Sequence, residues 1–201
     1  MSEESAVTTA ADVAGTLTGT GQGGATWNNG ETFDPDAQFD GSTGTITAGH
    51  AVSSDGNFTV SFWVKPSVLS QTVISQDGTE GAIFKIYPSI NTYWAFAMAR
   101  TDDPASTVLW DAAISATGTT KLGIWYHITA TYDASTDLMS LYVNDKLAGT
   151  KSHTTLSDKS NGNLQIARMR VTAASTGYSG YTKSEIANVQ TWNSVVNPVG
   201  R

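Results

Sequence analysis

The chain has 201 residues, of which only 14% are charged, and its net charge is −7 at pH 7. Its 11 lysines and arginines are scattered along the sequence, so we do not expect a phosphate-binding surface or a nucleic-acid partner. The absence of cysteine excludes a disulfide framework and thiol chemistry, but it leaves the cellular compartment open. No run of about 18 apolar residues occurs, and no basic-then-apolar segment follows Met1, so we expect neither membrane insertion nor a signal peptide within this sequence.

The length suits one domain, and the first 30 residues differ in character from the rest. Residues 1–30 are small and polar, and Trp27 is their first large apolar residue. We expect them to form a loosely packed N-terminal segment along one edge of the domain, with residues 31–201 as its body. Residues 19–24, GTGQGG, match G-x-G-x-x-G, but no apolar strand precedes them and no helix follows. We interpret this stretch as a flexible loop rather than a nucleotide site.

The rest of the chain alternates apolar and polar residues along short stretches, which is the pattern of half-buried strands. Residues 58–66 read FTVSFWVKP, and residues 81–89 and 92–100 read as two neighbouring strands, GAIFKIYPS and TYWAFAMAR. The predicted inward positions of these three strands are Phe58, Val60, Phe62, Val64, Ala82, Phe84, Ile86, Trp94, Phe96 and Met98. Pro66 and Pro88 each end a strand.

A dense aromatic stretch, WYHITATYD, occupies residues 125–133. Alternation places Tyr126, Ile128, Ala130 and Tyr132 on one face, and we predict that this face lies in the core between two sheets. Residues 133–137 then join this strand to the next as a hairpin, whose inward positions are Met139, Leu141 and Val143. Asn144 and Asp145 follow as a two-residue turn, because both residue types tolerate positive φ, and residues 146–150 return as a strand.

Short strands separated by turns rich in glycine, serine, asparagine and aspartate, with no convincing long helix, predict an all-β fold. We expect an antiparallel two-sheet sandwich rather than a parallel α/β sheet. Four motifs then carry a resemblance to a known family: FTVSFWVKP, IWYHITATYDASTDLMSLYVNDKLAGT, NLQIARMR and SEIANVQTWN. In order and spacing the chain resembles the laminin-G-like and pentraxin-like jelly rolls of the concanavalin A-like superfamily, over residues 38–193, and looks like one of their bacterial members. The resemblance implies a two-sheet jelly roll with a non-catalytic role in binding glycans or cell-surface proteins.

The pentraxin-like members bind ligands through calcium, and that implied site departs from the family pattern here. The acidic cluster expected after the strand NLQIA is replaced by Arg168, Met169 and Arg170, and guanidinium groups do not ligate a cation. The other half of the site falls near Thr79 and Glu80, which keep one carboxylate. We therefore do not carry the family's calcium site over to this chain.

A separate acidic string, DPDAQFDG, contains Asp34, Asp36 and Asp40. It resembles the start of an EF-hand loop, but Gln38 takes the third ligand position and Thr45 stands where the bidentate glutamate belongs. A structural calcium ion at the three aspartates is one hypothesis, and solvated turns are the other. We expect no other cofactor.

Two groups of residues are candidate ligand-binding sites. On strands that would have to adjoin, Trp63, His127 and Tyr142 share the outward parity, and such an aromatic patch suits the C–H face of a sugar ring; the alternative is that a long loop covers it. Tyr178 and Tyr181 lie in the loop STGYSGYTK, with Arg168 and Arg170 on the approach to it. Tyrosine supplies contact area at a low entropy cost, and arginine is a bidentate donor, so the four residues suit glycan recognition. The alternative is that the tyrosines fold over the end of the sandwich and the arginines are solvated.

Catalysis is not expected from these residues. Glycoside hydrolases of the superfamily need two carboxylates about 5 to 10 Å apart in a cleft. The five glutamates, Glu3, Glu4, Glu31, Glu80 and Glu185, are isolated or lie in expected tails and loops. There is no HExxH motif and no phosphate-binding GxxxxGK loop. We therefore expect a lectin-like module of a larger exported protein, secreted or at the cell surface, or alternatively an adhesive protein-binding domain without sugar binding. The sequence leaves the bound glycan or protein, the parent protein and the oligomeric state open.

Overall fold

The computed structural model describes residues 9–11, 17–28, 36–154, 162–174 and 177–198. One sheet contains β1 (Thr9–Ala10), β2 (Gly19–Gln22), β5 (Thr45–Ala48), β7 (Ile74–Asp77), β8 (Ala82–Pro88), β9 (Trp94–Ala99), β10 (Trp110–Ile114) and β14 (Leu164–Ile166). The other contains β3 (Ala25–Asn28), β4 (Asp36–Asp40), β6 (Phe58–Pro66), β11 (Tyr126–Asp133), β12 (Leu138–Val143), β13 (Lys146–Ser152) and β17 (Lys183–Trp192). β15 (Met169–Arg170) and β16 (Tyr178–Ser179) pair as a separate two-stranded ribbon.

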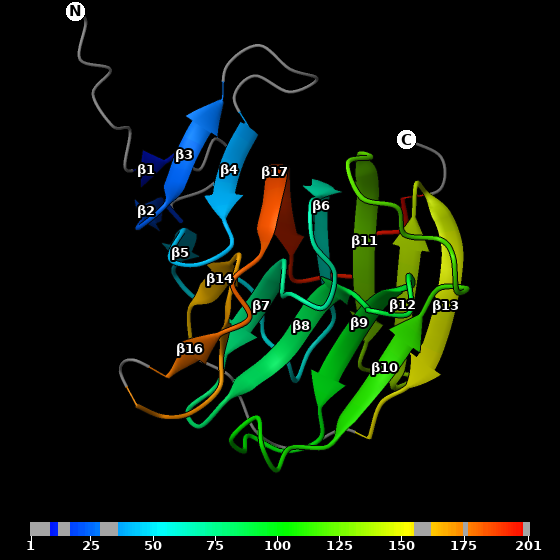
Figure 1. Ribbon diagram of the computed structural model, residues 1–201. Coiled ribbons are helices and arrows are strands. Elements are labelled where there is room, and N and C mark those ends of the chain that lie inside the picture. Colours follow the sequence, from blue (N-terminus) through cyan, green and yellow to red (C-terminus); the bar gives the residue numbers. More distant parts are fainter. Residues whose placement is uncertain (1–8, 12–16, 29–35, 155–161, 175–176, 199–201) are drawn as a thin grey trace, which may run out of the picture.

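The two large sheets pack face to face, as Figure 1 shows. Across the described chain the strand order is β1-β2-β5-β14-β7-β8-β9-β10 in the eight-stranded sheet and β13-β12-β11-β6-β17-β4-β3 in the seven-stranded sheet. Every pairing within these two sheets is antiparallel. The predicted all-β, antiparallel two-sheet jelly-roll sandwich is therefore confirmed. The described residues include no helix of a length and hydropathy that would cross a membrane.

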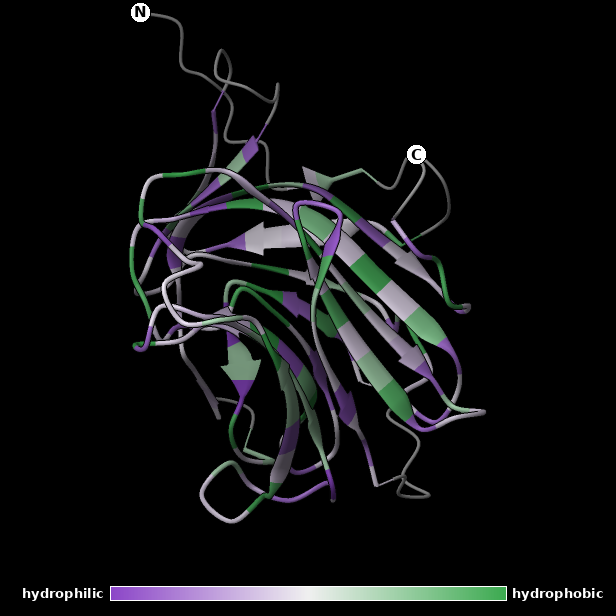
Figure 2. Cartoon of the chain, turned by 90° about the vertical axis from the view of Figure 1, so that its right-hand side faces the viewer, coloured by the Kyte–Doolittle hydropathy of each residue, from purple (hydrophilic) through white to green (hydrophobic). Residues whose placement is uncertain are grey.

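The alternation in the sequence sets the inner face of each strand. Figure 2 shows hydrophobic residues alternating with paler or hydrophilic ones along the strands. All the predicted inward residues of β6, β8 and β9 are buried, and so are Tyr126, Ile128, Ala130 and Tyr132 of β11. The aromatic stretch WYHITATYD thus supplies a wall of the core with its alternate residues, as predicted. Apolar burial of this kind is the main driving force for packing two sheets together.

An aromatic cluster joins the two sheets at the centre of the core. The ring of Phe58, on β6, lies 5.3 Å from that of Phe84 and 6.1 Å from that of Phe96, on the opposite sheet. It also lies 5.9 Å from the ring of Tyr132, on the neighbouring strand β11. These centroid distances lie in the range where aromatic pairs attract one another beyond the effect of burial alone. Phe58 therefore links the two sheets through ring contacts with two aromatic residues of the opposite sheet.

The hairpin from β12 to β13 turns as the sequence predicts. Asn144 and Asp145 both adopt positive φ, 50° and 64°, which is the conformation of a type I′ turn. Asn144 also exchanges hydrogen bonds with His127: its backbone N–H donates to the His127 carbonyl, and its side-chain oxygen accepts from the His127 N–H. The turn is thus tied to β11 as well as to its own two strands.

The described part of the first 30 residues forms strands at the edges of both sheets. β1 and β2 extend the eight-stranded sheet beyond β5, and β3 pairs with β4 at the edge of the other sheet. The interpretation of residues 19–24 as a flexible loop was wrong for β2, which is a paired strand. Small residues are needed here because a Cβ at Gly19 would collide with the Ile46 side chain, and one at Gly24 with the Asp40 carboxylate.

Asp111 lies on β10, the edge strand of the eight-stranded sheet, and links this sheet to the segment that follows β13. It forms an ion pair with Arg100 at 2.6 Å and accepts hydrogen bonds from the His153 ring and the Thr154 N–H, both at 3.1 Å. Burial acts to raise the pKa of Asp111, but the hydrogen bonds from Arg100, Thr154 and His153 outweigh it and lower the pKa to about 2. Asp111 is therefore ionised and stabilising at neutral pH.

We predict that this contribution disappears in acid. Because the pKa in the folded state lies below the ordinary value of 3.8, the stabilisation is present above that value and is lost as the pH falls towards 2. Asp111→Asn should lower the free energy of unfolding by about 2 kcal/mol at pH 7 and by much less near pH 2. Urea unfolding of both proteins at several pH values tests this, and a difference that does not change with pH would contradict it.

Candidate functional site

Arg168, Arg170 and Tyr178, which the sequence analysis grouped together, meet in the ribbon β15–β16. The Arg168 guanidinium carbon lies 3.8 Å from the centre of the Tyr178 ring, and that of Arg170 lies 5.3 Å from it. The short ribbon makes this possible, because Arg170 pairs directly with Tyr178 across it. We call these three residues, together with Asp77 and Gln165, the Arg–Tyr cluster.

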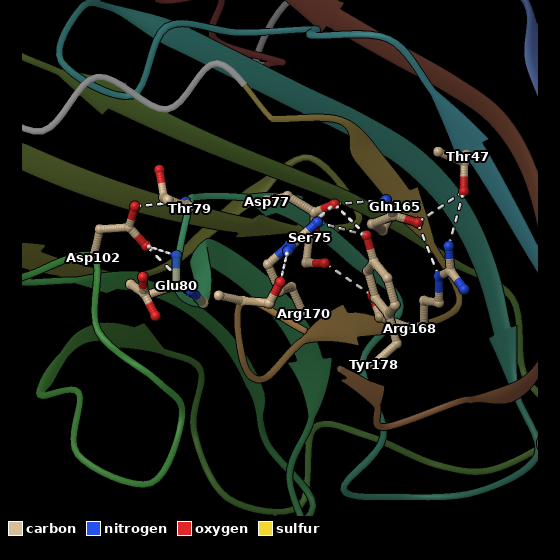
Figure 3. Close-up of polar contacts among 12 residues, drawn as sticks. Thr47, Ser75, Asp77, Thr79, Glu80, Asp102, Gln165, Arg168, Arg170 and Tyr178 are labelled. Atoms are coloured by element: carbon tan, nitrogen blue, oxygen red, sulfur yellow. Dashed lines mark hydrogen bonds and ion pairs between the residues drawn. The ribbon is translucent and has the colours of Figure 1, made fainter. Parts of the chain in front are cut away.

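Asp77, at the end of β7, is the buried centre of the Arg–Tyr cluster (Figure 3). One of its oxygens, Oδ2, accepts hydrogen bonds from the Tyr178 hydroxyl and from the Gln165 amide, both at 2.8 Å, and lies 3.7 Å from Arg170 Nε. Burial raises the pKa of the Asp77 carboxyl, and burial together with Asp77 raises the pKa of the Tyr178 hydroxyl. The Tyr178 hydroxyl therefore stays protonated and donates to Asp77 at neutral pH.

Arg168 is held in place by residues on several strands. Its Nε donates to Gln165 Oε1 at 2.9 Å, its Nη2 donates to Thr47 Oγ1 at 3.1 Å, and its carbonyl accepts from the Ser75 hydroxyl at 2.8 Å (Figure 3). Thr47, Gln165 and Ser75 are directly paired on β5, β14 and β7. They alternate with core residues, so they lie on the outer face of the eight-stranded sheet. The Arg–Tyr cluster is therefore a preformed surface on that face.

Tyr181 does not join this cluster. It forms an isolated parallel bridge with Thr72, ahead of β7, and is partly exposed. Among the residues that the structure describes, no ring contact links Tyr181 to Tyr178. The four candidates thus separate into a cluster of three and a neighbouring tyrosine.

The structure shows a second cluster on the same outer face that the sequence analysis missed. Lys85 on β8 reaches across β9 towards Trp110 on β10, and its Nζ lies 4.3 Å from the centre of the indole and 5.1 Å from the ring of Tyr87. We call Lys85, Tyr87 and Trp110 the Lys85 cluster. Lys85 pairs with Ser75 on one side and with Ala97 on the other, so the two clusters lie on one continuous face.

The alternation of inward and outward residues in β8 and β9 contained a signal for the Lys85 cluster. The outward positions of β8 and β9 carry Lys85, Tyr87, Ala95 and Ala97, where an ordinary solvent face carries polar side chains. Small residues on β9 leave room for the side chains of β8 and β10 to meet above them. The sequence alone did not pair Trp110 with this face, because its strand had not been recognised.

The outer face of the seven-stranded sheet carries the other predicted patch. Trp63 and His127 are directly paired on β6 and β11, and their rings stack with centroids 4.9 Å apart. Both ring nitrogens of His127 have partners: Nε2 lies 2.8 Å from the Ser61 hydroxyl, and Nδ1 lies 2.6 Å from the Asp145 carboxylate. The condition that these strands adjoin is thus met, but the imidazole is already fully hydrogen-bonded.

Tyr142 lies apart from this pair. It sits opposite Thr129 on β12, it is buried, and its hydroxyl donates to Asn197 Oδ1 at 3.0 Å. Thr59 bonds to the same C-terminal segment, donating to the Ser194 carbonyl. Residues 194–197 therefore cross the outer face of the seven-stranded sheet and cover Tyr142.

The acidic string that suggested calcium is spread along β4. Asp36 and Asp40 are the first and last residues of this strand, about 13 Å apart at the rise of an extended chain, which is too far for one ion. Asp40 instead caps a turn: its carboxylate accepts from the N–H groups of residues 42–44 and from the hydroxyls of Ser42 and Thr43. These hydrogen bonds hold the pKa of Asp40 far below its ordinary value. Asp34 lies outside the described residues.

The half-site near Thr79 and Glu80 is a turn between β7 and β8. The Asp102 carboxylate accepts hydrogen bonds from the backbone N–H groups of both residues and of Gly81 (Figure 3). In the part of the chain that the structure describes, no three histidine, aspartate or glutamate side chains are grouped so that they could hold a metal ion. Where the resemblance implied acidic ligands, Arg170 places a cation beside Asp77.

The described chain is thus an antiparallel two-sheet sandwich with aromatic and cationic side chains gathered on one outer face. A family model described as the concanavalin A-like lectin/glucanases superfamily, of laminin G type, matches residues 40–199. The chain therefore belongs to this family. No curated protein sequence matches it.

Solved structures with a similar fold include the binding domains of two botulinum neurotoxins. For serotype G the identity is 15% and the TM-score 0.65, with 92% of this chain and 45% of that chain covered. For serotype C1 the values are 15%, 0.64, 90% and 45%. A heptameric SAP-like pentraxin from Limulus polyphemus shares 16% identity, with a TM-score of 0.53, over 71% of this chain and 66% of that one. The chain spans less than half of the toxin domains, and identities this low show the fold alone.

Proposed function

We propose that the chain is a non-catalytic recognition module that binds a glycan through the outer face of its eight-stranded sheet. The observation that carries the proposal is the pair of preformed aromatic and cationic clusters on this one face. Aromatic rings stack on the C–H faces of sugars, and arginine and lysine donate hydrogen bonds to their oxygens. The family description and the binding domains with a similar fold support this reading. In this proposal the chain works at the cell surface or outside the cell, within a larger exported protein.

The carboxylates also favour binding over hydrolysis. Asp77 and Asp111 are buried and are already engaged by Arg170 and Arg100, and Glu185 pairs with Lys65 at 3.1 Å. A glycosidase needs one carboxyl to protonate the leaving oxygen and a second that is free to attack or to activate water. These three carboxylates lack that freedom.

A screen of the purified domain on a glycan array, with calcium and again with a chelator, tests the proposal. We expect saturable binding that free sugar competes away and that the chelator does not abolish. Loss of binding on chelation would show that the domain binds glycans through calcium, contrary to the proposal. If the domain binds no glycan in either condition while its circular dichroism spectrum shows intact β-sheet, glycan binding is contradicted.

A specific observation favours adhesion between proteins as the second candidate. A groove of about 460 Å³ lies between the end of β10 and the β12–β13 hairpin, and Tyr126, Val143 and Leu147 contribute to its walls. Leu147 and the nearby Ile114 are largely exposed, at 57% and 46%. Exposed apolar side chains beside a groove are typical of protein interfaces. Sedimentation velocity over a range of concentrations distinguishes this candidate: association that Leu147→Ser abolishes, without any response to sugars, would favour it.

A further inference from the structure

Lys85 is a partly buried cation that has no anionic partner among the residues described by the structure. Its ammonium contacts the faces of Trp110 and Tyr87, and it makes no hydrogen bond or ion pair with any residue that the structure describes. Burial lowers the pKa of Lys85 below its ordinary value of 10.5. An ammonium carries three N–H donors, and leaving them unbonded in a partly buried position destabilises the fold. The cation–π contacts offset only part of this cost.

The register of three strands explains why Lys85 reaches Trp110. Lys85, Ala97 and Ala112 are directly paired on β8, β9 and β10, and Trp110 pairs with Ala99. The lysine and the indole therefore extend towards each other above β9, where the outward residues are alanines. A larger side chain at position 97 would separate them. The alanines thus serve to bring a cation and an aromatic face together at one place on the surface.

The charges on this face differ from those of the whole chain. The net charge of the protein is −7, yet Lys85, Arg168 and Arg170 all lie on the outer face of the eight-stranded sheet. Asp77 is the carboxylate of the neighbouring Arg–Tyr cluster, and Arg170 and Tyr178 already engage it. Lys85 is left as a positive charge whose donors face no carboxylate among the described residues. A ligand that completes this arrangement carries a negative charge next to an apolar, ring-shaped surface.

We propose that the Lys85 cluster is a subsite for an acidic saccharide, in which a carboxylate or sulfate group binds the Lys85 ammonium and the sugar ring packs on Trp110 and Tyr87. This inference rests on the proposed glycan-binding function and names its ligand class. A saccharide suits the site because the flat aromatic faces match its C–H face, while the anion supplies the acceptors that the ammonium lacks. Binding of this kind weakens as salt screens the charges.

The test compares pairs of ligands that share a sugar backbone, with and without their acidic groups. Calorimetry would measure the binding of hexagalacturonate and of its fully methyl-esterified form, and of a sulfated carrageenan hexasaccharide and its desulfated form, which has no acidic group. We expect the acidic member of at least one pair to bind about tenfold more tightly than its neutral counterpart. The carboxylate and sulfate pairs identify which acid the subsite prefers. Poly-glutamate that binds as tightly as the acidic sugars would overturn the choice of a saccharide.

Three variants test whether Lys85 causes the preference for acidic over neutral sugars. Lys85→Met should remove it, lowering the affinity for the acidic sugar about tenfold, while Lys85→Arg should stay within about threefold of wild type. Lys151→Met, which removes an exposed lysine on β13, is the matched control and should change nothing. Lys85→Met that binds the acidic sugar as wild type does would overturn the inference. If neutral glycans bind equally well to all variants, the proposed function stands and this inference fails; if no glycan binds, both fail.

A second measurement needs no variant. The pKa of the Lys85 side chain in the wild-type protein, followed by NMR, should lie below the ordinary lysine value of 10.5 and should rise when the acidic hexasaccharide is added, because a nearby anion favours the charged form. A pKa that does not change at saturating ligand would overturn the proposed contact, even if Lys85→Met failed to fold.

Discussion

Replacement of Asp77 with alanine is expected to lower the free energy of unfolding by about 3–5 kcal/mol. Its carboxylate accepts hydrogen bonds from the Tyr178 hydroxyl and the Gln165 amide and forms an ion pair with Arg170, so the substitution leaves two donors without this acceptor and Arg170 without its anionic partner. Removing one partner of a buried polar network costs much more than the network adds to stability, because the remaining groups stay desolvated. Urea unfolding at pH 7 measures the difference.

Asp102→Ala is the matched control for this experiment. Asp102 also accepts several hydrogen bonds, but it does so in a turn that is only partly buried, so the expected loss is about 1 kcal/mol. If Asp77→Ala unfolds within 1 kcal/mol of wild type, the Arg–Tyr cluster is not the rigid element described above. That result would also contradict the proposal that the Arg–Tyr cluster is a preformed part of the binding surface on the eight-stranded sheet.

Phe58→Ala is expected to be equally damaging, at about 3–5 kcal/mol. Phe58 is fully buried, and its ring contacts Phe84 and Phe96 across the core and Tyr132 on the adjacent strand. The cavity left behind cannot collapse easily, because it is walled by two sheets whose positions many hydrogen bonds fix. Denaturant unfolding again gives the value.

Two further variants give reference values for the loss of stability expected from Phe58→Ala. Phe58→Leu keeps most of the volume and should cost less than about 1.5 kcal/mol. Ile90→Ala removes an apolar side chain that is 70% exposed and should change stability by no more than about 0.5 kcal/mol. An equal loss from Phe58→Ala and Ile90→Ala would contradict the position assigned to the aromatic cluster.

Most of the inner face of the sandwich was predictable from the sequence, because burial on one side of a strand leaves a period-two pattern in neighbouring residues. The alternation in β6, β8, β9, β11 and β12 identified the buried residues, and the positive φ of Asn144 and Asp145 follows from their residue types. Strand order was not predictable in this way. β14 lies between β5 and β7 because of contacts between residues about 90 to 120 apart in the chain, and local patterns contain no information about such pairings.

The same limit applies to the candidate site: groups of residues close in the sequence were predictable, and contacts between distant residues were not. Arg168, Arg170 and Tyr178 were grouped from the sequence because they lie within eleven residues of one another, whereas Asp77, which contacts Arg170 and Tyr178, is about 90 to 100 residues away. Trp63 and His127 were paired on the condition that their strands adjoin, and they do. Lys85 was missed because it needs Trp110, two strands away, to give it an environment. Recognising such a cluster requires the register of three strands.

The central claim is that the outer face of the eight-stranded sheet is the recognition surface, and NMR mapping of ligand-induced amide shifts tests it most directly. With the tightest glycan from the array, we predict that the shifts concentrate on β8, β9, β10 and the ribbon β15–β16. Shifts concentrated instead around Trp63 and His127, or beside the groove at Leu147, would contradict the claim and place recognition elsewhere on the sandwich.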